Sequence, residues 1–260
     1  MPEFCKTERD GRLFIVTINR PDVMNSLHPM ANAELERAFD EFAEDPEMWV
    51  AIVTGAGDKA FSAGNDLKFQ AAMPAGQRPQ HPKKGFGGLT ARFDLNKPLI
   101  AAVNGVAMGG GFEIALACDI IIASETAIFA LPEPRVGLAA LAGGVHRLPR
   151  MIPLKKAMGM MLTGRRVSAQ EGKELGFVTE VVKPADLMKE AKRWAGLILE
   201  CSPMSVRATK QAAMAGLHFA SAEEAMKGTY PAVQAMAASQ DFVEGPRAFA
   251  EKRPPKWKGQ

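Results

Sequence analysis

Short apolar runs rich in Val and Ile alternate along this chain with segments whose apolar residues recur every three or four positions. The runs have the pattern of buried strands, and they occupy residues 13–19, 50–54, 99–103, 120–123 and 128–131. Between the first two runs, Leu27, Leu35, Phe39 and Phe42 form the apolar stripe of a helix. Helical crossovers join parallel strands and cover both faces of a sheet, so this alternation predicts an α/β fold with largely parallel strands.

Composition narrows the classes of function that suit the chain. Its 260 residues are 47% hydrophobic, which is enough for a substantial core, and a dispersed net charge of +3 offers no basic stripe for nucleic acid. Cys5, Cys118 and Cys201 are widely spaced, with no CxxC pair, so a reducing compartment and no metal site are expected. No run reaches the roughly 18 apolar residues of a membrane span, and we therefore expect a cytoplasmic protein without a membrane partner.

The last hundred residues have mostly helical patterns. Ser168 and Glu171 form a capping box with a matching stop at Gly176, and a strand is predicted over residues 178–182. Further helices are predicted over residues 184–199, 203–215 and 222–238. The helices nearest the C-terminus are rich in Ala and Met, which permits close packing either within the chain or with another subunit. Residues 71–88 are dense in Pro, Gly, Gln and Lys and predict a long loop, either a lid or a loop without a role.

A glycine cluster follows the third apolar run. Residues 104–111 read NGVAMGGG and lead directly into a helix that begins near Phe112. This order places bare backbone N–H groups and the positive end of a helix at one spot, where a phosphate or the oxygen of a polarised carbonyl could bind. Tight packing of strand on helix would favour the same glycines. Neither GxxxxGK[ST] nor GxGxxG spacing is present, so a nucleotide site of either type is not supported.

Two glutamates stand close to this cluster in the sequence. Glu113 lies in the first turn of the helix among apolar neighbours, and Glu133 lies between two prolines at the end of an apolar run. Each alone could be a helix cap or a loop charge. A second glycine-bearing segment, FSAGNDL at residues 61–67, could turn another N–H toward the same cleft or could be a simple loop before a helix. The four histidines are scattered, and neither HExxH nor GxSxG occurs.

Taken together, the motifs resemble the crotonase (enoyl-CoA hydratase/isomerase) superfamily. The matching segments are FSAGNDL, KPLIAAVNGVAMGGGFEIALACD, FALPEPRVGL, AGGVHRL and LTGRRVSAQEGKELGFV, and they occur in the order typical of that family. Several separated motifs in register are far more specific than any one of them. The last twenty residues also resemble the C-terminal end of family members that include carnitinyl-CoA dehydratases, which extends the resemblance over nearly the whole chain.

The resemblance implies a spiral of ββα turns over residues 1–200 and a helical region over residues 201–260 that forms trimers or hexamers. It implies an acyl-CoA substrate, no separate cofactor and no metal. Glu113 and Glu133 fall on the family's catalytic acid/base pair, and the N–H groups of Ala63 and Gly110 fall on its oxyanion hole. The substrate would be bound by Ala63, Gly64, Asn65, Asp66, Leu67 and Gly110.

The resemblance also suggests where the coenzyme A moiety would lie. The turn at residues 21–25 would line its channel, and its phosphates would be held by cations among Lys252, Arg253, Lys256 and Lys258, reaching from the same or a neighbouring subunit.

One segment departs from the family pattern. Many hydratases have a Pro-Gly or Pro-Asp pair before the double glycine, whereas this chain has Ala140, Leu141 and Ala142. The backbone N–H groups survive the change, but the water site becomes more apolar. Retention of both glutamates favours hydration or dehydration of a 2-enoyl-CoA. Double-bond isomerisation, or another reaction through an enolate, is the alternative, followed by binding of acyl-CoA without catalysis.

Overall fold

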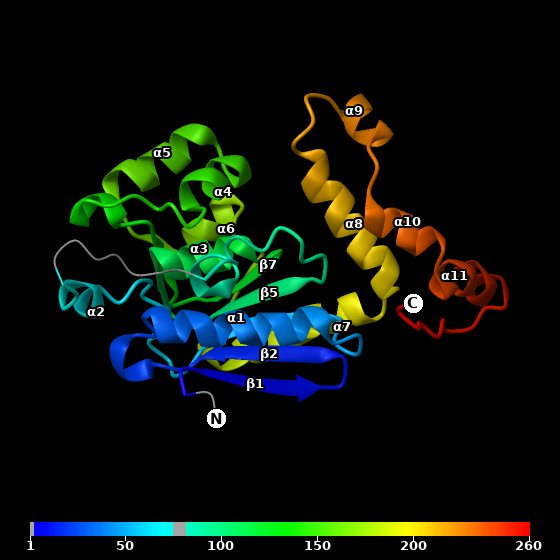
Figure 1. The fold of residues 1–260 in the computed structure, drawn as a ribbon, viewed down its shortest axis with the longest axis horizontal. Coiled ribbons are helices and arrows are strands. Elements are labelled where there is room, and N and C mark those ends of the chain that lie inside the picture. The colour runs from blue at the N-terminus through cyan, green and yellow to red at the C-terminus, as the bar shows by residue number, and fades with distance from the viewer. Residues whose placement is uncertain (1–2, 75–81) are drawn as a thin grey trace.

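The computed structural model describes residues 3–74 and 82–260. Within them the larger sheet has six strands, of which β1, β2, β5 and β7 are labelled in Figure 1. The strand order is β1-β2-β3-β5-β7-β10. These strands are β1 (Cys5–Asp10), β2 (Leu13–Ile18), β3 (Val50–Gly55), β5 (Leu99–Val103), β7 (Ile120–Ser124) and β10 (Glu180–Val182). The β1–β2 pair is antiparallel and the remaining pairs are parallel, as the sequence predicted.

A smaller sheet of four short strands stacks beside it, in the order β4-β6-β8-β9. Its strands are β4 (Ala60–Ser62), β6 (Val106–Met108), β8 (Ile128–Ala130) and β9 (Val167–Ser168). Strands β3, β5 and β7 of the large sheet each lead into a strand of the small one, and α2 (Leu67–Ala71) and α3 (Gly110–Ala117) follow β4 and β6. The chain therefore repeats a ββα turn, and the predicted fold class is confirmed.

Both faces of the large sheet are covered by helices, which explains its uninterrupted apolar strands. On one face α1 (Pro29–Glu44) buries Leu35, Phe39 and Phe42, and the Phe42 ring stacks on Phe14 of β2 at 5.8 Å. On the other, α7 (Leu187–Leu199) packs Leu187, Ala191 and Ala195 against the strands. Helix α1 begins at Pro29, where the missing N–H of proline costs no hydrogen bond, and the His28 ring caps the helix by accepting a hydrogen bond from the Ala31 N–H.

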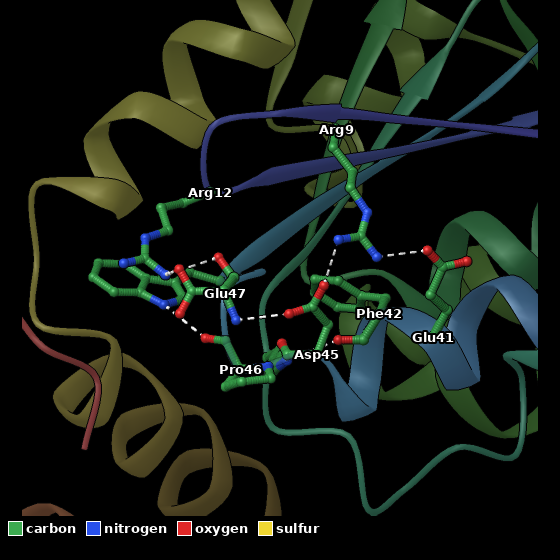
Figure 2. A network of polar contacts seen from close by, with 9 residues as sticks. Arg9, Arg12, Glu41, Phe42, Asp45, Pro46 and Glu47 are labelled. Atoms are coloured by element: carbon green, nitrogen blue, oxygen red, sulfur yellow. Dashed lines mark hydrogen bonds and ion pairs between the residues drawn. The ribbon is translucent and has the colours of Figure 1, made fainter.

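Charged side chains tie the N-terminal hairpin to the end of α1 (Figure 2). Arg9 on β1 pairs with Glu41 at 2.7 Å and with Asp45 at 2.8 Å. Arg12, in the hairpin turn, bonds to Glu47 and lies 4.4 Å from the Trp49 ring. The network fixes the C-terminal end of α1 against the sheet edge, although β1 itself was not predicted because its alternate residues are charged.

The segment between β8 and β10 is mainly helical and is interrupted by the short strand β9. It contains the 3-10 turn η3 (Glu133–Val136), then α4 (Gly144–Met151), α5 (Leu154–Thr163) and α6 (Ala169–Leu175). The predicted helix is confirmed with half of the capping box, since Ser168 accepts a hydrogen bond from the Glu171 N–H at 3.1 Å but the Glu171 carboxylate pairs with Arg165. Gly176 adopts the left-handed conformation that ends α6. The short 3-10 segments elsewhere are η1 (Pro21–Val23), η2 (Phe86–Gly88) and η4 (Pro184–Asp186).

Four helices at the C-terminus lie to one side of the sheets (Figure 1). They are α8 (Pro203–Gly216), α9 (Ala222–Lys227), α10 (Pro231–Ala237) and α11 (Gln240–Ala250). The single helix predicted over residues 222–238 is wrong. Gly228 is extended and Pro231 opens a new helix, because a proline lacks the N–H that would continue the old one.

The predicted long loop over residues 71–88 falls partly on residues 75–81, which lie outside the described residues. In the described portion, α2 ends at Ala71 and η2 begins at Phe86. The division into a core of residues 1–200 and an oligomerisation region of residues 201–260 stays a prediction. Within the described part of the chain, no helix combines the length and apolarity needed to cross a bilayer.

Candidate active site

The glycine cluster forms the junction between β6 and α3. Gly109 has φ 54° and ψ −126°, a conformation that favours glycine, and α3 starts at the next residue. A Cβ on Gly110 would lie 2.4 Å from the Phe86 ring, and one on Gly111 would lie 2.1 Å from the Ser62 carbonyl oxygen. Close packing therefore requires these glycines, and the same packing leaves the start of α3 without side chains.

The FSAGNDL segment reaches the same place from β4. Gly64 has φ +84°, and a Cβ there would lie 2.6 Å from the Met108 carbonyl oxygen and 2.8 Å from the Gly110 nitrogen. The backbone of one glycine segment is thus pressed against the first turn of α3. The structure brings together two segments that 36 residues separate in the sequence.

Hydrogen bonding distinguishes the N–H groups of this junction. The Ala63 N–H donates to the Met24 carbonyl at 2.9 Å, and the Gly64 N–H donates to the Ser62 hydroxyl at 3.1 Å. Within residues 3–74 and 82–260, no acceptor is bonded to the N–H of Asn65 or of Gly110. The expectation that Ala63 supplies an oxyanion donor is therefore corrected, since its N–H is already committed, and Asn65 is the better candidate.

Asp66 and Leu67 serve the structure of the loop. The Asp66 carboxylate caps α2 through the Phe69 N–H at 3.0 Å and pairs with Arg20 at 2.9 Å. Partial burial opposes ionisation, but these partners outweigh it and lower the pKa of Asp66. Leu67 is the first residue of α2 and is half exposed. Both of the carboxylate's oxygens are occupied, so Asp66 shapes the segment that carries Asn65.

Glu113 is buried in the first turn of α3, with only 3% of its surface exposed. Its Oε1 accepts a hydrogen bond from the Gly144 N–H at 2.8 Å. Burial, followed by the nearby charge of Glu133, raises the pKa of Glu113 to about 7, although the N–H groups of Gly144 and Ala142 and the charge of Arg147 oppose the rise. A carboxyl group with this pKa can give or take a proton near neutral pH.

Glu133 opens the η3 turn at the end of β8. Its Oε1 lies 3.0 Å from the position a Cβ on Gly109 would take, so the carboxyl reaches the start of α3. Its Oε2 is buried and has no hydrogen-bond partner in the described residues. Burial raises the pKa of Glu133 as well, opposed by its own backbone N–H. The two glutamates face the same junction, and both favour the protonated form more than an exposed glutamate does.

Ala140, Leu141 and Ala142 depart from the family pattern, but the loop that they form still donates a backbone hydrogen bond to Glu113. The Gly144 N–H still holds Glu113, and a Cβ on Gly144 would lie 3.1 Å from the Glu113 Oε1. Leu141 is 75% exposed, so the departing segment places an apolar side chain on the surface.

A cavity of about 310 Å³ lies beside the turn at residues 21–25. It is lined by Pro21, Asp22, Met24 and Asn25 and by residues 56–60, among them Lys59. Asn25 fixes the turn, because its side chain donates to the carbonyls of Ala56 and Ala60. This is a polar recess next to the loop that carries Asn65.

The cations named at the C-terminus are less free than the sequence suggested. Arg253 pairs with Glu244 and Glu251, each at 2.6 Å. No contact of Lys252, Lys256 or Lys258 in the described structure involves the junction of β6 and α3. Their role toward a phosphate stays a prediction.

Sequence reasoning missed two residues near the glutamates. Arg147 of α4 was read only as part of the GGVHRL motif, yet its charge acts on Glu113 and its Nη2 donates to the Thr90 carbonyl at 2.8 Å. Phe86 packs on Gly110, a contact without any signal in the sequence. His146 is exposed on α4, and no group of three His, Cys, Asp or Glu side chains suited to a metal occurs within the described ranges.

Comparison with known proteins identifies the family. The family model for enoyl-CoA hydratase/isomerase matches residues 8–260. The chain is 43% identical to a carnitinyl-CoA dehydratase of Salmonella arizonae and 41% identical to one of Salmonella typhi, with full coverage of both proteins in each case.

Solved structures agree with these relatives. An enoyl-CoA hydratase from Mycobacterium tuberculosis superposes with a TM-score of 0.89 at 36% identity, covering all of both chains. One from Bacillus anthracis gives a TM-score of 0.90 at 35% identity, over 99% of this chain and all of that one. The chain therefore belongs to the enoyl-CoA hydratase/isomerase family, as a lyase of the hydratase/dehydratase type that acts on coenzyme A thioesters.

Proposed function

We propose that this enzyme adds water across the double bond of a 2-enoyl-CoA thioester, or removes it, with Glu113 and Glu133 as the acid/base pair. The observation that carries the proposal is the meeting of two carboxyl groups of raised pKa at the bare N-terminus of α3. Glu113, with a pKa of about 7, can change protonation state near neutral pH, and burial raises the pKa of Glu133 as well, as suits a pair of general acid/base groups.

Asn65 and Gly110 form the proposed oxyanion hole. Water addition places oxygen on C3 and a proton on C2, and the transition state carries enolate charge on the thioester oxygen. The N–H groups of Asn65 and Gly110, which have no acceptor in the described residues, belong to two segments that contact each other. The Gly110 N–H also lies at the N-terminus of α3, where the helix dipole is positive. One such donor typically contributes about 3 kcal/mol to the transition state.

The two glutamates divide the proton transfers. The ionised carboxylate takes a proton from water as its oxygen bonds to C3, and the protonated carboxyl delivers a proton to C2. Glu113 is held rigidly by the Gly144 N–H, whereas the Glu133 Oε2 has no partner in the described residues and is left to meet water or substrate. The reaction needs no electron transfer, so the coenzyme A of the substrate is the only organic group we assign to the site.

The recess at residues 21–25 and 56–60 is the proposed channel for coenzyme A. It adjoins the loop that presents Asn65, and Lys59 supplies a cation for a phosphate. The helices of residues 201–260 are the proposed contact for a trimer or hexamer. They expose large apolar side chains that a partner would cover, namely Met214, Met226, Phe242, Val243 and Phe249, each more than half exposed.

A panel of substrates tests the function. Purified protein is mixed with crotonyl-CoA and with longer, branched and betaine-bearing enoyl-CoAs, since relatives are named carnitinyl-CoA dehydratases, and the loss of enoyl-thioester absorbance is followed. We expect at least one member to be hydrated, with the 3-hydroxyacyl-CoA identified by mass. Silence toward the whole panel, combined with conversion of a 3-enoyl-CoA to its 2-enoyl isomer, would replace hydration by isomerisation.

A further inference from the structure

Arg147 lies in α4, and three contacts fix its guanidinium. Its Nη2 donates to the carbonyl of the buried Thr90 at 2.8 Å. Its Cζ lies 5.4 Å from the centre of the Phe93 ring, within the range of a cation–π contact. Gly143, the N-cap of α4, has φ 117°, and a Cβ there would collide with the Arg147 Nη1. The positive charge therefore has a fixed place against the backbone at the N-terminal end of α4.

The same end of α4 binds Glu113 of α3. Gly144, the residue after Gly143, donates its N–H to the Glu113 Oε1 at 2.8 Å, and the two helices pack together. Burial raises the pKa of Glu113, and the charge of Arg147 opposes that rise. Burial likewise lowers the pKa of Arg147, and the charge of Glu113 opposes that fall. The two groups therefore interact through their charges.

An arginine is costly at this position unless its charge has a use. The side chain is partly buried, and no carboxylate forms an ion pair with it within residues 3–74 and 82–260. The positive N-terminal end of a helix also disfavours a nearby cation. Cys118, the other group whose charge would act on Arg147, keeps a neutral thiol because burial raises its pKa. Glu113 is therefore the carboxyl that compensates the charge of Arg147.

Few other charged groups face Glu113. Glu133 on η3 disfavours its ionised form, as burial does. Strands β4 and β6 and the turn η2 also pack on α3, and none of the three carries a titratable side chain. The remaining titratable groups of α4, His146 and Arg150, are exposed. Arg147 is therefore placed to offset the effect of Glu133 on Glu113.

We propose that Arg147 is a positioning residue of the acid/base pair, which holds a fixed positive charge near Glu113 so that this carboxyl can both lose and regain a proton during turnover. Arg147 contacts no reacting atom and acts only through Glu113. The catalytic part of the inference rests on the proposed function, whereas the coupling of the two charges does not.

The first test measures the coupling by unfolding and does not depend on activity. A raised pKa in the folded state stabilises the protein below the unfolded pKa, and this contribution is lost as the pH rises through the folded pKa. Without the Arg147 charge, the pKa of folded Glu113 should rise by about one further unit. The stability lost between pH 5.5 and pH 8.5 should therefore be larger in Arg147→Gln than in native protein by about 1.4 kcal/mol, the equivalent of a tenfold change in proton affinity.

Urea unfolding at one protein concentration measures this difference, and further variants separate charge from packing. Arg147→Met, which also lacks the charge, should show the same increase, whereas Arg147→Lys should keep the native pH dependence. In a Glu113→Gln background, Arg147→Gln should change stability equally at both pH values. Arg150→Gln is the matched control, because it removes an exposed cation of α4 that donates to the His146 carbonyl at 2.7 Å, and it should leave the pH dependence unchanged.

The second test is the pH profile of kcat/KM for crotonyl-CoA hydration. The limb near pH 7 should move upward by about one pH unit in Arg147→Gln and stay in place in Arg147→Lys. A residue that only braced α4 would lower turnover in both variants without moving that limb.

Two results would overturn the inference. One is an equal pH dependence of unfolding in native protein and in both neutral variants, even if their turnover falls. The other is a difference that persists in the Glu113→Gln background, since the Arg147 charge would then act on another group. If the unfolding data show the coupling but native protein hydrates no substrate, the coupling stands and the proposed hydration alone fails.

Discussion

Replacing Glu113 by Gln should make the protein more stable at alkaline pH while it impairs catalysis. Glu113 is 3% exposed, and its pKa rises from 4.5 to about 7 on folding. At about 1.4 kcal/mol for each tenfold change in proton affinity, an ionised Glu113 costs the folded state about 3 kcal/mol. A glutamine avoids that cost, but its amide group is imperfectly hydrogen-bonded at this position, which costs about 1 kcal/mol. The expected net gain at pH 8.5 is about 2 kcal/mol.

The sign of the effect depends on pH. Below pH 4.5 the Glu113 carboxyl is protonated in both the folded and the unfolded state, so its full contribution to the free energy of unfolding is present. As the pH rises from 4.5 to about 7, the unfolded chain releases its proton first, and this contribution to stability is lost. The advantage of Glu113→Gln should therefore be about 2 kcal/mol larger at pH 8.5 than at pH 5.5.

Urea unfolding followed by circular dichroism, at one protein concentration and at both pH values, measures this difference. Glu171→Gln is the matched control, because the pKa of Glu171 is lowered by its bond to Arg165, so the charged form is the favoured one. That variant should lose stability where Glu113→Gln gains it. An equal change in the free energy of unfolding at the two pH values would refute the reasoning that burial controls the protonation of Glu113.

Two further variants test the supports of the site and of the C-terminal helices. Gly64→Ala would place a Cβ at φ +84° and 2.6 Å from the Met108 carbonyl, so we expect a loss of about 1–3 kcal/mol in stability and of most turnover, measured by unfolding and by hydration assay. Unchanged turnover would show that the Gly64 contact does not position Asn65. Ser202→Ala removes both the cap of α8 and the bond to Asp241 at 2.8 Å. The melting temperature should fall by a few degrees, for a loss of about 1–2 kcal/mol, and an unchanged value would contradict the anchoring of α11 through Ser202.

Much of the fold could be predicted because local signals agreed with tertiary structure. The runs at residues 50–54 and 99–103 are central strands covered on both faces, so burial made them apolar without interruption. Strand β1 was missed because it is an edge strand whose residues are mostly exposed and charged, and α11 because its sequence was read only through the family resemblance. The break between α9 and α10 was overlooked although Gly228 and Pro231 mark it.

The sequence predicted which residues belong to the candidate site better than it predicted their hydrogen bonds. Glu113 and Glu133 were singled out through the family resemblance, since each alone could have been a helix cap or a loop charge, and both lie at the junction of β6 and α3. The proposed oxyanion donor moves by two residues, from Ala63 to Asn65, since only the fold reveals that the Ala63 N–H donates to the Met24 carbonyl.

The most direct test of the account is the rate of crotonyl-CoA hydration by native protein and by Glu133→Gln, with coenzyme A binding measured in parallel. Loss of one acid/base group typically lowers turnover about 10²- to 10⁴-fold, so we expect a decrease of that size with unchanged binding and a native circular dichroism spectrum. If native protein hydrates the substrate and Glu133→Gln does so at a similar rate, Glu133 has no part in proton transfer and the two-glutamate mechanism is contradicted.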